Sequence, residues 1–598
     1  MHTLQLSRRA FSAGLATSLL LASSASRAAT APASPASRLA VIAQHYYDGV
    51  QALFPMAATE NVGDPAYEAK FEIDIAPAHL KRQRRHYQRT LASLRALDPA
   101  SLQPSQRLTY DLLVYEANDR MTTLDYPWRL MPVGHMNSMP VQLAQWASGT
   151  GPQPLKTAAN YDHFLARLKK LPAWIDQAIA NMREGQARGI VLPRALVERT
   201  LPQVDSLLPA DPLASPYLAA TREFPEGISG ADRQRLVAAY RATVANSVTP
   251  AVRRLRTFLA DRYLPGARST AGIGALPGGP HWYRILVRSS TTTTLSPDQI
   301  HELGLKEVAR IRGEMEQVKA KFGFAGDLDG FFRSLNDRPE LTPFHAESEV
   351  LAAYAALNER VKAGLPKLFE SAPRAPLDVR VVEPLRRATA SDHYIPPAAD
   401  GSRPGAFYAV VMDPAKYRTL RMASLFLHEG QPGHHYQIAM QQELDVPKFR
   451  KSGWYDAYGE GWALYAEGLG RELGLYDDPG AYLGRLFMEL HRALRLVVDT
   501  GLHDKGWSRE QAIAYLREKE GSTEDDARRA IERYMAWPAQ ALAYKVGELK
   551  ILELRERARE KLGARFDIRA FHAQVLGEGS MPLRMLETKI DNWIAAQR

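Results

Sequence analysis

The chain has 598 residues, of which 45% are hydrophobic and 24% are charged, as is typical of a soluble globular protein with one large core or two lobes; this excludes extensive disorder. The sequence contains no cysteine, which excludes disulfides, thiolate metal ligands and a lipid-bearing cysteine. The formal net charge of +10 is modestly basic and no recognition motif accompanies it, so we expect no nucleic-acid partner.

The N-terminus has the pattern of an export signal. Two arginines, Arg8 and Arg9, precede an apolar run at 13–22, and small residues follow. This order is typical of the twin-arginine pathway, and the apolar run is too short to serve as a stable membrane anchor. We therefore expect residues 1–28 to be a twin-arginine signal peptide and 29–37 a leader, so that the mature protein is periplasmic or otherwise exported.

The remainder of the chain, residues 38–598, is predicted to be a mainly α-helical catalytic domain. Apolar residues recur three and four positions apart through most of it, as at Leu108, Leu112 and Tyr115, which is the spacing of amphipathic helices. The clearest break in composition lies at 266–295, which is rich in glycine and threonine. We place a boundary between two lobes there, and a loop within one continuous domain is the alternative.

Two helix starts and three strands can be placed in this domain. Ser296 and Ser508 each precede a glutamine by three residues, which is the pattern of a capping box. Three short stretches are enriched in β-branched and aromatic residues and are predicted to be strands. They lie at 282–288, 379–383 and 407–412. We expect a small β-sheet beside the candidate active-site helix.

The most informative segment is HEGQPGHH, which runs from His428 to His435. In the H-E-x-x-H motif of zinc hydrolases, two histidines one helical turn apart hold the metal and the glutamate activates the attacking water. His434 follows His428 by six positions, which would point it away on a regular helix. Pro432 and Gly433 can break the helix and return His434 to the first histidine. We predict His434 as the ligand, with His435 as the alternative.

A second segment offers the carboxylate that a three-ligand zinc site requires. Glu460 and Glu467 lie two turns apart on one face of a predicted helix, among mostly apolar residues. A carboxylate in such a place needs a partner. One of the two can bind the metal while the other orients a histidine from behind. Glu429, which follows His428, is predicted to be the general base.

Further candidates lie downstream. Tyr544 stands one helical turn after Gln540, and its phenol could donate a hydrogen bond to a developing oxyanion; packing in the core with a satisfied hydroxyl is the alternative. Arg495 and His503 could contact substrate or support the ligands, but they are interpreted as structural hydrogen-bonding residues. Trp454 is interpreted as a core aromatic residue rather than a binding surface.

The two segments together resemble the bacterial domain-of-unknown-function 885 family, whose pattern is H-E-x-x-P-G-H followed by E-G-W-A-x-Y-x-E. These motifs begin here at His428 and Glu460, and Leu276–Gly279 and Gly501–His503 are also similar. The family looks like a distant relative of the mostly helical zinc peptidases with a glutamate ligand, among them the neurolysin-like and angiotensin-converting types. The resemblance implies Glu460, rather than Glu467, as the third ligand and a deep cleft between two helical lobes.

We therefore expect an exported zinc-dependent hydrolase, most simply a metallopeptidase that cleaves short peptides. The expected zinc ligands are His428, His434 and Glu460. Glu429 would be the base, Tyr544 would stabilise the oxyanion, and the segment 405–411 could align a peptide as an edge strand. Two alternatives remain, a zinc amidase acting on cell-wall peptides or other amides, and a non-catalytic envelope binding protein that retains a metal site.

Overall fold

The residues described by the computed structural model are 34–136, 138–149, 151–384, 387, 391–398, 401 and 403–597. Over these residues the protein is mainly helical, with a small β-sheet, as predicted. The predicted signal peptide lies outside them. The first helix begins at Pro35, where the side chain of Ser34 caps it. None of the helices in this part of the chain is long and apolar enough to span a bilayer.

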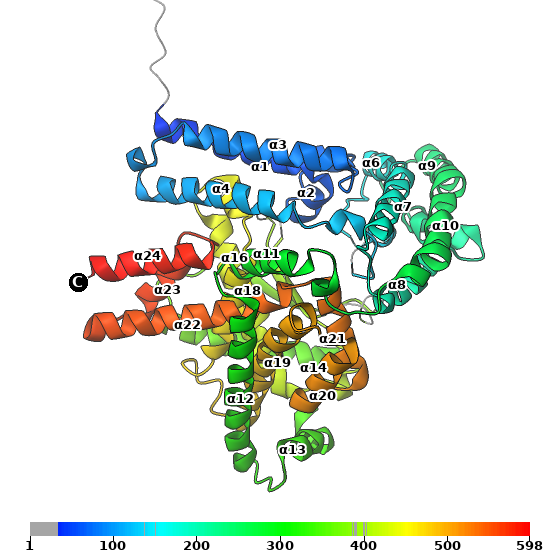
Figure 1. Cartoon of the computed structure of the whole chain (residues 1–598). Coiled ribbons are helices and arrows are strands. Elements are labelled where there is room, and N and C mark those ends of the chain that lie inside the picture. Colours follow the sequence, from blue (N-terminus) through cyan, green and yellow to red (C-terminus); the bar gives the residue numbers. More distant parts are fainter. Residues whose placement is uncertain are drawn as a thin grey trace, which may run out of the picture.

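The N-terminal helices form two groups (Figure 1). Three long helices, α1, α3 and α4, lie side by side. Helices α5 to α10 follow and enclose a hydrophobic core of their own, around Phe164, Trp174 and Tyr240. The helices are α1 (Pro35–Leu53), α2 (Pro55–Asn61), α3 (Pro77–Arg95), α4 (Pro104–Thr123), α5 (Met139–Trp146), α6 (Ala158–Leu168), α7 (Leu171–Ala187), α8 (Arg194–Ser206), α9 (Gly230–Thr243) and α10 (Thr249–Phe258).

The C-terminal helices surround the candidate site. α12 packs along α19, and α18 packs along α22. The helices are α11 (Gly279–Thr291), α12 (Pro297–Lys321), α13 (Leu328–Ser334), α14 (Glu347–Gly364), α15 (Met422–Glu429), α16 (His434–Glu443), α17 (Lys448–Lys451), α18 (Asp456–Gly468), α19 (Pro479–His503), α20 (Arg509–Glu520), α21 (Glu524–Ala536), α22 (Ala543–Leu562), α23 (Ile568–Leu576) and α24 (Leu583–Ala596).

The predicted helix starts are confirmed, whereas one predicted strand is wrong. Ser296 and Ser508 form capping boxes at the first turns of α12 and α20. Residues 282–288 lie instead within α11. Tyr283, Ile285 and Val287 are buried against the neighbouring helices, and tertiary packing outweighs the β propensity of the stretch. The predicted lobe boundary thus includes a helix that packs against α18 and α22.

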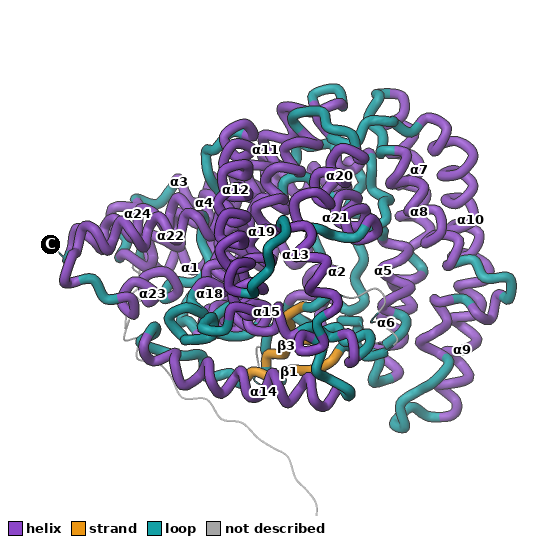
Figure 2. Tube along the Cα trace, turned by 90° about the horizontal axis from the view of Figure 1, so that it is seen from below, coloured by secondary structure: helices purple, strands orange, loops and turns teal. Residues whose placement is uncertain are grey.

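The sheet has three strands, and their order is β1-β3-β2. β1 (Leu377–Val381) and β3 (Gly405–Ala409) correspond to the second and third predicted strands, and β2 (His393–Ile395) is additional. β1 pairs with β3 in parallel and β2 pairs with β3 antiparallel. Because β3 is paired on both sides, the expectation that it aligns a peptide as an edge strand is wrong. β1 contacts α14, and β3 contacts α16, so the sheet lies beside the site as predicted; Figure 2 shows the strands next to α14 and α15.

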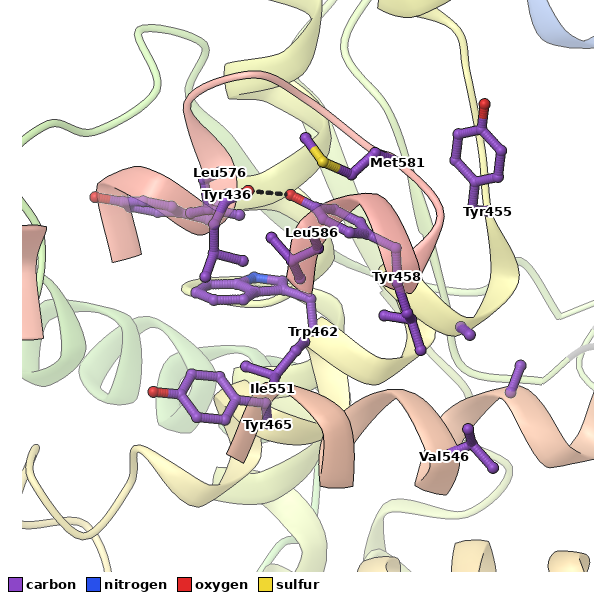
Figure 3. Packing of buried hydrophobic residues seen from close by; sticks show 14 of the residues in the cluster. Tyr436, Tyr455, Tyr458, Trp462, Tyr465, Val546, Ile551, Leu576, Met581 and Leu586 are labelled. Carbon is purple, nitrogen blue, oxygen red and sulfur yellow. Dashed lines mark hydrogen bonds between the residues drawn. The ribbon is translucent and has the colours of Figure 1, made fainter. Parts of the chain in front are cut away.

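Aromatic residues of α18 anchor this helix in the main core (Figure 3). Trp462 is fully buried, and its indole N–H donates to the carbonyl oxygen of Pro432 over 2.8 Å. A Cβ on Gly461 would lie 2.5 Å from the Cα of Gly547, so glycine is needed where α18 crosses α22. These contacts fix α18 against both α22 and the turn that follows α15.

Candidate metal centre

The chain between the two predicted histidine ligands leaves the helix, as the sequence indicates. α15 ends at Glu429, and α16 begins at His434 after a turn with a cis Gln431–Pro432 bond. A Cβ on Gly433 would lie 2.1 Å from the carbonyl oxygen of His428, so glycine is required in this turn. The break brings the ring centroids of His428 and His434 to 4.8 Å.

Glu460 of α18 faces both histidines. Its Oε2 lies 3.6 Å from Nε2 of His428 and 3.4 Å from Nε2 of His434. One ligand atom from each of the three residues lies within 4.8 Å of the others. The structure therefore brings together the three side chains that were predicted to bind metal.

Glu467 lies on the opposite side of His428. Its Oε1 is 2.9 Å from Nδ1 of His428, and its other oxygen accepts a hydrogen bond from the hydroxyl of Ser424. Glu467 is fully buried. A carboxylate on Nδ1 holds the ring so that Nε2 points toward Glu460 and His434, which is how ligand histidines are commonly supported. The geometry therefore matches the assignment in which Glu460 faces the centre and Glu467 stands behind it.

His435 points elsewhere. Its Nδ1 lies 3.0 Å from the hydroxyl of Tyr394 on β2, and it does not belong to the cluster. Burial lowers the pKa of His435 to about 4. The structure thus groups His434, and not His435, with His428.

The cluster has the chemistry of a metal site. Glu460 Oε2 is buried and has no hydrogen-bond partner, and the same is true of Nδ1 of His434. A buried carboxylate oxygen without a donor is costly unless a cation satisfies it. Two imidazoles and one carboxylate suit zinc and related divalent ions and leave coordination positions open. The residues present therefore fit a metal ion.

Protons should compete with the metal at His428. Burial disfavours the charged imidazole, but the carboxylates of Glu460 and Glu467 outweigh this effect and raise its pKa to about 9. Below that pH, metal binding through Nε2 must release this proton. We expect the apparent affinity of the stripped protein for zinc to rise about tenfold per pH unit between pH 6 and pH 8. Titration against a chelator of known affinity measures it; a pH-independent affinity would contradict the assignment.

Glu429 and Tyr544 flank the centre. Glu429 is 9% exposed and follows His428 in the last turn of α15. The Tyr544 ring, in the first turn of α22, is nearly parallel to the His428 ring at a centroid distance of 6.4 Å. Burial and the charge of Glu460 raise the pKa of Tyr544, so its hydroxyl remains a proton donor at neutral pH.

The turn before Tyr544 is held by a buried carboxylate. Both oxygens of Asp499, on α19, accept from the backbone N–H of Ala539, and Oδ1 also accepts from the hydroxyl of Tyr283 over 2.6 Å. Ala539 has a φ of +68°, which is unfavourable for a residue with a Cβ. Asp499 therefore stabilises the conformation that starts α22 and places Tyr544.

A buried ion cluster fixes α22 behind the centre. The ammonium of Lys545 is fully buried and lies 3.1 Å from Glu307 of α12, 2.5 Å from Glu489 of α19 and 2.7 Å from Glu548. Arg485 pairs with Glu548 over 2.8 Å. Because buried charges are tolerated only when they are paired, this cluster ties three helices together in one arrangement.

Three further side chains, His503, Trp454 and Arg495, differ in where they lie. His503 is structural, because Nδ1 accepts from the backbone N–H of Ile273 and Nε2 bonds to the carbonyl of Tyr534. Trp454 is not a core residue: it is 39% exposed, and its ring lies 5.8 Å from that of His434. Arg495 lies beside Tyr544, with its guanidinium 4.4 Å from the ring centre. Spacing alone gave no signal for these two placements, since both depend on contacts between different segments of the chain.

Comparisons with known proteins agree on the family and the fold. The model of a family described as bacterial proteins of unknown function, DUF885, matches residues 55–590. The crystal structure of a "putative lipoprotein" from Colwellia psychrerythraea is 29% identical and has a TM-score of 0.85, and the match covers 94% of this chain and all of that one. A solved structure from Shewanella oneidensis, called a "putative lipoprotein of unknown function", has a TM-score of 0.74 at 20% identity and shares the fold; 93% of this chain and 99% of that chain are covered.

No curated protein matches the sequence. The family model spans nearly the whole described chain, and it includes both the segment that carries His428 and His434 and the helix that carries Glu460. The protein therefore belongs to the DUF885 family of bacterial proteins of unknown function.

Proposed function

We propose that the protein is an exported zinc-dependent hydrolase, and specifically a metallopeptidase that cleaves short peptides. The observation that carries the proposal is the grouping of His428, His434 and Glu460 around one point, with Glu467 behind the first histidine and Glu429 beside it. Two imidazoles, a carboxylate ligand and an adjacent free carboxylate are the components of a hydrolytic zinc site.

Each side chain has a role in this proposal. His428, His434 and Glu460 would hold the metal, which when bound would polarise the scissile carbonyl and make water more acidic. Glu429 would take a proton from the attacking water and pass it to the departing amine. The hydroxyl of Tyr544 would donate a hydrogen bond to the oxygen that gains negative charge.

Access and location are consistent with this role. The side chains of His434 and Glu460 are 11% and 15% exposed, and the more exposed Trp454 lies beside His434, so these two ligand side chains are partly open to solvent. The similar structure from Colwellia psychrerythraea is called a "putative lipoprotein", a name that is consistent with export. We infer export of this chain as well, by the twin-arginine route that its first residues indicate.

The proposal is tested by metal analysis and product profiling of the purified protein. We expect about one zinc ion per chain after reconstitution, and metal-dependent cleavage of an unbiased peptide library. Cell-wall fragments are assayed in parallel. Cleavage of these fragments alone would favour the amidase, and metal binding without any turnover would favour the envelope binding protein. Failure to bind any stoichiometric divalent metal would refute all three.

A further inference from the structure

One arginine lies next to the proposed oxyanion donor. Arg495 of α19 is 9% exposed. Its guanidinium is 4.4 Å from the ring centre of Tyr544 and 5.8 Å from that of Tyr534. Because the Tyr544 ring is itself stacked on His428, a single aromatic residue separates Arg495 from the metal centre.

The Arg495 guanidinium has unused hydrogen-bonding capacity. Its Nε and Nη1 are buried and make no hydrogen bond, and no carboxylate forms an ion pair with it among the residues that the structure describes. Nearby acidic side chains have other partners: Glu520 is 2.9 Å from Nδ1 of His491, and Asp499 holds the turn at Ala539. Buried guanidinium donors that face no acceptor are costly, and an anionic ligand would satisfy them.

A second arginine adds to the positive charge. Arg492 lies one helical turn before Arg495, is also buried, and is 5.8 Å from the Tyr544 ring. Its Nε has no hydrogen-bond partner, and its Nη2 is 4.0 Å from Glu467. The planar guanidinium matches a carboxylate, with which it can form two parallel hydrogen bonds.

We propose that Arg495, supported by Arg492, binds a carboxylate of the substrate, so that the enzyme acts near the C-terminus of short peptides. The inference rests on the proposed peptidase function and adds its specificity. Consecutive Cα atoms are about 3.8 Å apart, so a terminal carboxylate one or two residues beyond the scissile bond lies further along the peptide by about the width of the single ring that separates Arg495 from the metal centre. The product would be a single amino acid or a dipeptide. The side-chain carboxylate of an aspartate or glutamate in the peptide offers the same chemistry. The experiment below distinguishes it from the C-terminal carboxylate.

The test measures binding to the metal-loaded Glu429→Gln protein by equilibrium dialysis and mass spectrometry. Three N-acetylated tripeptide libraries are compared: free acids without aspartate or glutamate, the corresponding C-terminal amides, and amides that contain aspartate or glutamate. We expect the free acids to bind about tenfold to a hundredfold more tightly than the plain amides. Preference for the acidic amides alone would assign the subsite to a side-chain carboxylate. Equal binding of all three libraries, or binding of none, would overturn the proposal.

Variants then locate the subsite. Arg495→Met is expected to abolish the preference for acids over amides, and Arg495→Lys to retain the charge but lose most of the preference, because the ammonium cannot form the paired bonds. Arg529→Met is the matched control, since this arginine is 59% exposed on α21. Undiminished discrimination in folded, metal-loaded Arg495→Met would refute the assignment. If the Glu429→Gln protein binds free acids more tightly than amides but the wild-type protein cleaves no peptide, the peptidase function is refuted and the carboxylate subsite stands.

Discussion

Replacement of Glu429 by glutamine is expected to reduce kcat by about 10²- to 10⁴-fold while zinc content stays near one per chain. Glutamine has nearly the shape of glutamate but cannot take a proton from water. Glu429 lies beside His428 and is not one of the three side chains of the cluster, so the ligand set should survive. The measurement is kcat on the best library peptide, together with metal analysis of the same preparation.

The control for this experiment is Glu359→Gln, because Glu359 is 72% exposed on α14. It should leave both kcat and zinc content unchanged. Wild-type turnover in Glu429→Gln would show that another group is the base. Loss of zinc in Glu429→Gln would show instead that Glu429 binds the metal, and the roles of the centre would have to be reassigned.

Replacement of His434 by alanine is expected to remove zinc from the protein, whereas His435→Ala should retain it. His434 faces Glu460 at 3.4 Å; His435 is bonded to Tyr394 on β2. Two remaining ligands bind zinc too weakly to survive gel filtration in buffer without metal. Zinc per chain after this step is the measurement, and circular dichroism verifies that both variants are folded.

Glu467→Gln provides an intermediate case in the same series. Its carboxylate contacts His428 on the side away from the centre, so the ligands remain but the support for the ring is weakened. We expect zinc affinity to fall about tenfold to a hundredfold. Retention of zinc by His434→Ala with loss in His435→Ala would reverse the ligand assignment. Complete loss of zinc in Glu467→Gln, with zinc retained in Glu460→Gln, would show that Glu467 binds the metal and Glu460 does not.

Local sequence signals predicted much of the helical framework correctly. The capping boxes at Ser296 and Ser508 and the helix break at Pro432 and Gly433 depend on residues within one or two turns of each other. Such signals act through backbone dihedrals and local hydrogen bonds. They are therefore readable from the sequence before any tertiary contact is known.

The predictions that were wrong concern residues whose state depends on distant partners. The stretch 282–288 has strand propensity but becomes part of α11, because its apolar side chains face a helical core. β3 has no free edge, because β2, a strand of three residues, pairs with it. Trp454 is exposed beside His434 rather than buried, which no periodicity within its own segment indicates.

The sequence by itself narrowed the candidate ligands to His428 with His434 or His435, and to one of the two carboxylates Glu460 and Glu467, through residue type, spacing and a helix-breaking Pro-Gly pair; the preference for Glu460 came from the family resemblance. Only the tertiary structure decided that Glu467 supports His428, that His435 turns to β2, and that Arg495 lies behind Tyr544. The physical reason is that spacing along the sequence fixes only the directions in which the side chains of one helix point. Which side chains of different helices meet is decided by the packing of α15, α18, α19 and α22 against one another.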